Sequence, residues 1–283
     1  MESYLAILQI PAVWLCTAAV LGLLTGSFLN VVVARLPVMM EREWHDDCTI
    51  LQGGDPPERA TFNLAVPRSH CPHCGEVLQA RDLVPVLSWL WLRARCRHCQ
   101  AAIAWRYPAL ELATAGLFVA CASTFGVGVA AIAAMGYSAA LLTLAAIDLD
   151  TMLLPDSLTQ PLLWAGLVLT LTPWGWISVT DAVAGAAAGY AALWVVGTAF
   201  RLATGKEGMG QGDMKLLAAM GAWLGWQNLP GVVLAASLVG VAGGLGMRLA
   251  GRLAKDEPLP FGPCLAGAGL AALFWSDMMQ WWR

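Results

Sequence analysis

The chain has 283 residues, of which 58% are hydrophobic and only 12% are charged, and its formal net charge at pH 7 is −3. A soluble domain carries about 25% charged residues. The composition therefore excludes an ordinary water-soluble domain and predicts an all-α protein that crosses a lipid bilayer several times.

The first apolar stretch, residues 13–33, is long enough for one membrane-spanning helix, which needs roughly 20 residues. No basic residue precedes Pro11, and the stretch ends at Arg35 rather than at a small-residue cleavage site. A cleaved signal peptide is therefore not expected. We assign residues 1–34 to the first transmembrane helix.

Residues 35–107 form the one extended polar block, and we predict that they fold as a small inserted domain. The block contains two CxxC pairs separated by 21 residues. They are Cys71 with Cys74 and Cys96 with Cys99. Two such pairs are typical of a four-thiolate zinc site, which is closed and structural. A redox role is the weaker alternative because one pair would suffice, and His73 and His98 are possible alternative ligands.

From Pro108 onward the chain is mostly apolar, and we assign residues 108–283 to a seven-helix membrane core. With the first stretch, the candidate spans number about eight. The seven later stretches are 108–124, 128–147, 158–172, 182–203, 214–228, 231–250 and 261–280.

The basic residues predict the topology. All but one of the 16 Lys and Arg fall in three groups, within residues 35–107, 201–215 and 248–255. The alternate loops, near residues 125, 175 and 229, have none. Eight spans with an external amino terminus place all three groups on the cytoplasmic side, as the positive-inside rule requires. The polar block is then cytoplasmic, where thiols stay reduced and can bind metal.

Two acidic positions border the membrane on that same side. Asp148 ends one apolar stretch, and Asp213 opens another, close to the small residues Gly210 and Gly212. Ionisable groups at membrane depth are costly and usually functional. Two carboxylates brought together can share one proton, so that one activates water while the other protonates a carbonyl oxygen. This predicts an aspartic-peptidase dyad of Asp148 and Asp213.

Other interpretations of these acids remain open. Asp213 could simply cap a helix, and Asp150 is the rival to Asp148 for the first catalytic position. Asp156 follows Pro155 and is interpreted as a helix cap. A transporter could use Asp148 and Asp213 to bind protons or cations, but ion transport requires neither the CxxC pairs nor the glycine-rich motif at Asp213. A purely structural membrane scaffold would leave both aspartates replaceable.

The motifs together resemble the type IV prepilin leader peptidase family of bifunctional membrane enzymes, and the resemblance covers nearly the whole chain. The resemblance rests on these segments: Gly26–Pro37, the two CxxC pairs, Arg106–Pro108 with Glu111, Ile147–Asp156, Gly210–Lys215 and Pro260–Pro263. The family's catalytic aspartates fall on Asp148 and Asp213.

The resemblance implies an inner-membrane aspartic endopeptidase of type IV pilus biogenesis or type II secretion. Such enzymes cut the basic leader of prepilins or pseudopilins after a Gly, at the cytoplasmic face. They then methylate the new amino-terminal residue, usually Phe, with S-adenosylmethionine. No nucleotide-binding fingerprint is present, so the methyl-donor site has no assigned residues. The expected partners are these substrates and the bilayer, not nucleic acid.

Overall fold

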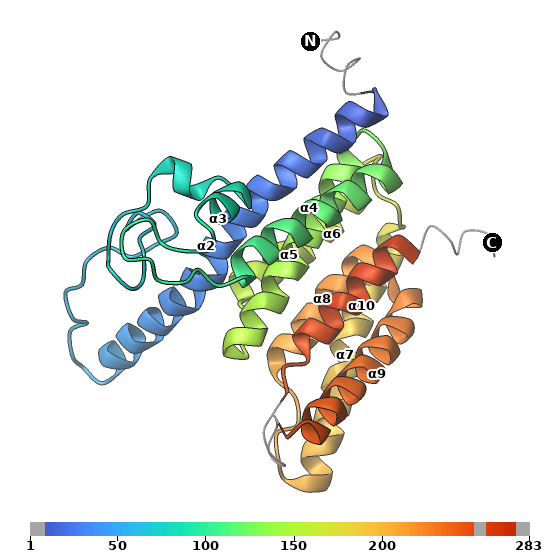
Figure 1. Ribbon diagram of the computed structural model, residues 1–283. Coiled ribbons are helices and arrows are strands. Elements are labelled where there is room, and N and C mark those ends of the chain that lie inside the picture. Colours follow the sequence, from blue (N-terminus) through green and yellow to red (C-terminus); the bar gives the residue numbers. More distant parts are fainter. Residues whose placement is uncertain (1–8, 252–258, 276–283) are drawn as a thin grey trace. The chain divides into compact units, whose positions relative to one another are not determined.

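The computed structural model describes residues 9–251 and 259–275 (Figure 1). The chain divides into two compact units, Met1–Val127 and Gly128–Arg283. Both are helical. Within the described ranges, the β pairing consists of two isolated bridges in the first unit. The predicted all-α architecture is confirmed.

The first unit contains two long helices, α2 (Pro11–Leu51) and α4 (Arg106–Phe125). Between them lie the short 3₁₀ helix η1 (Ala80–Leu83) and the short helix α3 (Leu87–Trp91). Helix α2 continues well past the apolar stretch at 13–33. Apart from Pro37, residues 36–51 contain no helix breaker, and the helix stops just before Gly53 and Gly54.

Small residues allow α2 and α4 to pack closely. A Cβ atom on Gly22 would lie 2.5 Å from the Cα of Ala115, and one on Gly26 would lie 2.6 Å from the Cα of Glu111. Real Cβ atoms do not approach other carbons so closely. These two glycines therefore set the distance between the helices, as small residues do in membrane proteins.

Polar contacts attach the inserted segment to these helices. The Arg35 guanidinium of α2 donates to the carbonyl oxygens of Asn63 at 2.9 Å and Pro67 at 2.7 Å. From α4, the buried Glu111 accepts a hydrogen bond from the backbone N–H of Val86, with Oε2 at 2.7 Å. The segment is thus tied to both of the helices that flank it.

The second unit consists of six α-helices and the 3₁₀ helix η2 (Trp226–Asn228) within the described residues. The helices are α5 (Val129–Thr151), α6 (Asp156–Thr170), α7 (Val179–Thr204), α8 (Gln211–Leu224), α9 (Leu229–Leu249) and α10 (Gly262–Trp275). Each of the eight predicted apolar stretches therefore coincides with a helix. Residues 276–280 of the last stretch lie outside the described residues.

Five of the described helices are long and apolar enough to cross a bilayer: α2, α4, α5, α7 and the segment Trp226–Leu249 that contains α9. Helices α6, α8 and α10 are shorter, at 14 or 15 residues. The predicted polytopic membrane class agrees with these helices.

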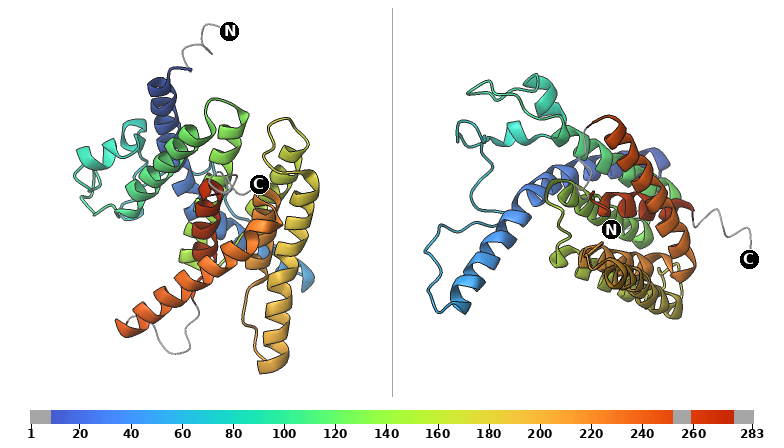
Figure 2. Two further views of the ribbon diagram at one scale, coloured as in Figure 1. Left: turned by 90° about the vertical axis from the view of Figure 1, so that its right-hand side faces the viewer. Right: turned by 90° about the horizontal axis from the view of Figure 1, so that it is seen from below.

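Helix α8 forms the centre of the second unit. It packs against α6, α7, α9 and α10, and α10 packs in turn against α5 and α9. In Figure 2, α10 is red and α9 is orange. Gly185 of α7 faces Gly221 of α8, and a Cβ on Gly189 would lie 2.5 Å from the carbonyl oxygen of Leu217. Every residue of α8 from Leu216 to Leu224 is buried.

Candidate active site and candidate metal centre

Asp148 lies in the last turn of α5 and is buried, with 5% of its surface exposed. The helix ends because Met152 adopts the left-handed conformation and its N–H bonds to the Asp148 carbonyl oxygen at 2.9 Å. The Asp148 side chain accepts a hydrogen bond from the backbone N–H of Gly262, with Oδ2 at 3.0 Å. Gly262 is the first residue of α10, so the carboxylate faces a helix amino terminus.

Asp213 lies in the first turn of α8 and is half-buried. The N-cap of α8 is Gly210, so the interpretation of Asp213 as a helix cap is wrong. Leu154 lies beside both Gly212, the residue before Asp213, and Gly262, whose N–H contacts Asp148. The structure thus brings together two acids that are 65 residues apart in the sequence.

Glycines permit the close approach of the segments around the two acids. A Cβ on Gly212 would lie 2.8 Å from the Cβ of Leu154, in the turn that follows α5. A Cβ on Gly262 would lie 2.7 Å from the Asp148 Oδ2 atom. One on Gly210 would lie 3.8 Å from the Asp213 Oδ2 atom, which is an ordinary contact. The Pro260–Pro263 motif marks Gly262 in the sequence, but it does not indicate this contact.

The two rival acids occupy different surroundings. Asp150 is exposed, two residues beyond Asp148 on α5. Asp156 does not cap α6, whose N-cap is Pro155, so that prediction is wrong. Instead, both Asp156 carboxylate oxygens accept hydrogen bonds from Lys215 Nζ, at 2.6 and 2.8 Å. Sequence reasoning gave Lys215 no role, although it stands two residues after Asp213.

Four thiols gather in the first unit. The Sγ atoms of Cys71, Cys74, Cys96 and Cys99 all lie within 4.8 Å of one another, and no histidine joins this cluster within the described residues. Cys71 Sγ and Cys99 Sγ are 3.8 Å apart. Two thiolates about 2.3 Å from one tetrahedral Zn²⁺ stand about 3.8 Å apart, so the donor set fits a zinc ion.

The two CxxC segments have the same local fold. In each, the first cysteine's carbonyl oxygen accepts from the residue after the second cysteine, Gly75 or Gln100, which has positive φ in both cases. Each segment is closed by one antiparallel bridge, between His70 and Val77 or between Arg95 and Ala102. The sequence spacing alone does not reveal this local repeat.

Backbone N–H groups donate hydrogen bonds to the sulfur atoms of the cluster. Hydrogen bonds from the Cys74 and His73 backbone lower the pKa of Cys71 to about 7, and those from Cys99 and His98 lower the pKa of Cys96. The Glu76 N–H favours the Cys74 thiolate, but desolvation and the neighbouring sulfurs outweigh it and raise the pKa of Cys74 to about 11. A cation would be needed to hold all four as thiolates.

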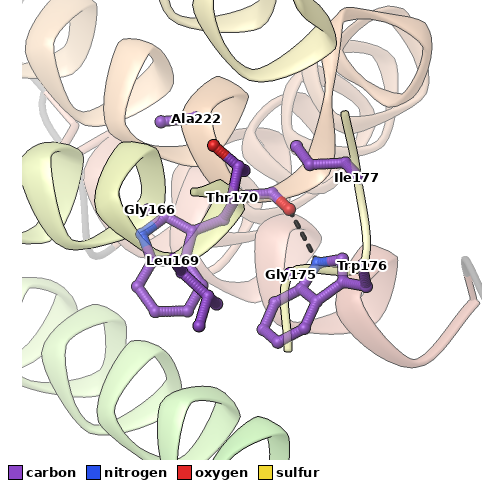
Figure 3. Close-up of a pocket in the computed structure, with 8 residues that line it drawn as sticks. Gly166, Leu169, Thr170, Gly175, Trp176, Ile177 and Ala222 are labelled. Carbon is purple, nitrogen blue, oxygen red and sulfur yellow. Dashed lines mark hydrogen bonds between the residues drawn. The ribbon is translucent and has the colours of Figure 1, made fainter. Parts of the chain in front are cut away.

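A separate hollow lies at the carboxyl ends of α6 and α8, whereas Asp213 lies at the amino end of α8. Figure 3 shows residues that line this hollow. Gly166, Trp176 and Trp223 are among the residues that line it, and no ionisable side chain is. Trp176 Nε1 donates to the Trp223 carbonyl oxygen at 2.8 Å. The hollow has no group that could carry acid–base chemistry, so the acids, rather than this hollow, form the candidate active site.

Comparison with known proteins gives two family matches. Residues 20–125 match the bacterial peptidase A24 N-terminal domain, and residues 135–245 match the type IV leader peptidase family. The two matched ranges contain the four-cysteine cluster and both acids, respectively.

Three similar bacterial proteins are each named prepilin leader peptidase/N-methyltransferase. The protein of Aeromonas hydrophila is 51% identical over 96% of this chain and 94% of its own length. That of Burkholderia pseudomallei strain 1026b is 54% identical over 92% of this chain and 85% of its own. That of Dickeya chrysanthemi is 45% identical over 96% of both. No solved structure matches this chain.

Proposed function

Because the chain belongs to the type IV leader peptidase family, we propose that it is a membrane aspartic endopeptidase and N-methyltransferase. It removes the leader of type IV prepilins or type II secretion pseudopilins after a Gly. It then transfers a methyl group from S-adenosylmethionine to the new amino-terminal residue. The observation that carries the peptidase assignment is that the segments with the buried Asp148 and with Asp213 meet around Leu154.

We assign the catalytic roles to Asp148 and Asp213. Two carboxyl groups that repel each other tend to retain one proton between them, which is the state an aspartic peptidase needs. Gly210 and Gly212 support the site from the α8 side. The exposure of Asp150 and the ion pair of Asp156 favour Asp148 over both rivals.

We assign the four cysteines to a structural zinc ion. Cys71, Cys74, Cys96 and Cys99 would hold it, with backbone N–H groups stabilising the thiolates. When bound, the ion supplies a cross-link between two chain segments rather than chemistry on the substrate. The binding site of the methyl donor has no assigned residues.

We place the protein in the bacterial inner membrane, with residues 35–107 on the cytoplasmic side and the amino terminus in the periplasm. The distribution of basic residues supports this orientation. The dyad would then act at the cytoplasmic face, where a prepilin presents its leader. The substrate's own apolar helix would lie in the same bilayer.

The test is cleavage of a purified prepilin by the full-length protein in lipid. We expect Asp148→Asn and Asp213→Asn each to lower the rate by a factor of at least about 10⁴, because neither acid alone can complete the proton transfers. Asp150→Asn, which changes an exposed acid on the same helix, is the matched control and should retain most activity. Substantial cleavage by either dyad variant would refute the assignment.

A further inference from the structure

We infer that the two acids of the dyad have fixed, different roles, and that Gly262 is the positioning residue that separates them: its backbone N–H holds Asp148 as the ionised base, which leaves the shared proton on Asp213. The inference rests on the proposed peptidase function. It adds a residue from α10 to a site otherwise built from α5 and α8.

The hydrogen bonding around Asp148 is the first observation. Its Oδ2 atom accepts from the Gly262 N–H at 3.0 Å, in a buried setting. A backbone N–H can only donate, and its hydrogen bond to an ionised carboxylate is stronger than its bond to a neutral carboxyl group, so it favours the ionised form. Gly262 also opens the 14-residue helix α10, whose amino terminus favours negative charge.

The absence of a side chain at position 262 is the second observation. A Cβ there would lie 2.7 Å from the Asp148 Oδ2 atom, 3.0 Å from its Cγ and 3.2 Å from the Leu154 Cδ2 atom. Gly262 lies outside the left-handed region, so its backbone conformation does not require glycine. Glycine is required here because the carboxylate occupies the space that a side chain would fill.

The surroundings of the two acids complete the asymmetry. The titratable groups that face Asp148 from neighbouring helices are Asp213 on α8 and Cys264 on α10 itself. On α6, the Asp156 carboxylate accepts a hydrogen bond from Lys215 Nζ. Within residues 9–251 and 259–275, the Gly262 N–H donates to the Asp148 carboxylate, whereas no backbone N–H donates to the Asp213 carboxylate. The proton therefore belongs on Asp213.

With these roles, both acids return to their starting protonation states at the end of the reaction. The Asp148 carboxylate takes a proton from water, the water oxygen bonds to the Gly carbonyl carbon of the substrate, and Asp213 gives its proton to the carbonyl oxygen. In the second step Asp148 gives its proton to the leaving nitrogen as the C–N bond breaks. Asp213 recovers a proton from a hydroxyl of the intermediate. Asp148 ends ionised and Asp213 protonated, as they began.

The first experiment compares two alanine variants on the same helix. Gly262→Ala should lower kcat for prepilin cleavage on the order of 100-fold, because the added Cβ displaces the base. Gly267→Ala is the matched control, since nothing lies within 4 Å of a Cβ at that position, and it should leave kcat unchanged. Equal activity of the two variants would overturn the inference.

The pH profile separates positioning from general damage. Without the amide contact Asp148 keeps its proton up to higher pH, so the acidic limb of kcat/KM should move to higher pH in Gly262→Ala. Repeating the profiles with Cys264→Ala in both backgrounds removes the other titrating neighbour on α10. A uniform loss of activity with an unmoved acidic limb would contradict the proposed role.

A second measurement uses the unaltered protein, so it remains valid even if the Gly262→Ala protein does not fold. An epoxide alkylates ionised carboxylates, whereas a diazoacetyl compound esterifies protonated ones. In the unaltered protein, peptide mass spectrometry should find the epoxide on Asp148 and the diazo product on Asp213. The reverse pattern would overturn the inference. If Asp148→Asn or Asp213→Asn still cleaves prepilin, the dyad assignment fails, and if the unaltered protein does not cleave prepilin, the proposed function fails. Both results are independent of Gly262.

Discussion

At the scale of single residues, the site depends on which polar groups a carboxylate meets. Four acids lie near one another in the sequence or in space, and each has different surroundings. Asp148 accepts from a backbone amide, Asp213 is half-buried in the first turn of α8, and Asp156 pairs with Lys215, whereas Asp150 lies at an exposed position of α5. Their residue type is the same, so the surroundings decide which acid can hold a catalytic proton.

The Lys215–Asp156 ion pair should contribute little to catalysis despite its place beside the dyad. The Lys215 side chain is 28% exposed and that of Asp156 is 56% exposed, and exposed pairs contribute only about 0–1 kcal/mol. We expect Lys215→Met and Asp156→Asn each to reduce the prepilin cleavage rate at most about 5-fold. The double variant should be no worse than either single one, since the pair acts as a unit.

The measurement is the cleavage rate at low and high salt. High salt should lower the cleavage rate of the unaltered protein slightly, because it screens the ion pair, and should leave the rate of the Lys215→Met protein unchanged. A Lys215→Met protein that is inactive at every salt concentration would instead assign Lys215 a direct contact with substrate.

At the scale of elements, the sequence predicted where helices occur better than where they end. All eight apolar stretches became helices because a membrane offers the backbone few other ways to satisfy its hydrogen bonds. The extension of α2 to Leu51 was not predicted, because its charged residues favour a solvated helix and a loop equally in a composition count. The cap of α6 was misassigned because Asp156 found a stronger partner in Lys215.

The four-cysteine element should depend on its metal. Purified protein should contain about one zinc per chain, and Cys74→Ser should lower both zinc content and the thermal stability of residues 35–107, because metal binding is part of folding. Cys48→Ser is the control, since Cys48 is exposed on α2 and lies outside the cluster.

Metal analysis and protease sensitivity of this segment measure the effect. Removing the ion from intact protein with a chelator should reproduce the Cys74→Ser result. Active, zinc-free protein with undiminished protease resistance would contradict the metal assignment. Visible absorbance from bound iron would replace zinc with a redox metal.

At the scale of the whole molecule, composition predicted the membrane class, cysteine spacing predicted the four-thiol cluster, and the acidic motifs led to Asp148 and Asp213. None of these signals could predict that Gly262 touches Asp148, because 114 residues separate them and only packing of α10 on α5 joins them. Contacts of this kind leave no spacing signal. The Pro-Phe-Gly-Pro motif marked the position without revealing its partner.

The position of the proposed dyad at the helix ends predicts a limit on the substrate. Asp148 lies in the last turn of a 23-residue apolar helix, so the scissile bond should be held close to the bilayer surface by the prepilin's own helix. Inserting about four polar residues between that bond and the helix should lower the cleavage rate at least about 10-fold, since proximity to the dyad is lost.

The control substrate carries the same insertion upstream, within the leader, and should be cleaved normally. Rates are measured with both substrates in vesicles of one lipid composition. Equal cleavage of the two would show that the enzyme does not use the membrane to locate the bond.

The burial of α8 affects how the enzyme responds to bilayers of different thickness. With 14 residues, the helix is about 21 Å long, well short of the roughly 30 Å hydrocarbon layer. It is surrounded by α6, α7, α9 and α10 rather than by acyl chains. A change in bilayer thickness acts on the lipid-facing outer helices through tilt and mismatch. The depth of Asp213 is instead set by protein packing, which separates the position of the proposed catalytic acid from the lipid composition of the host membrane.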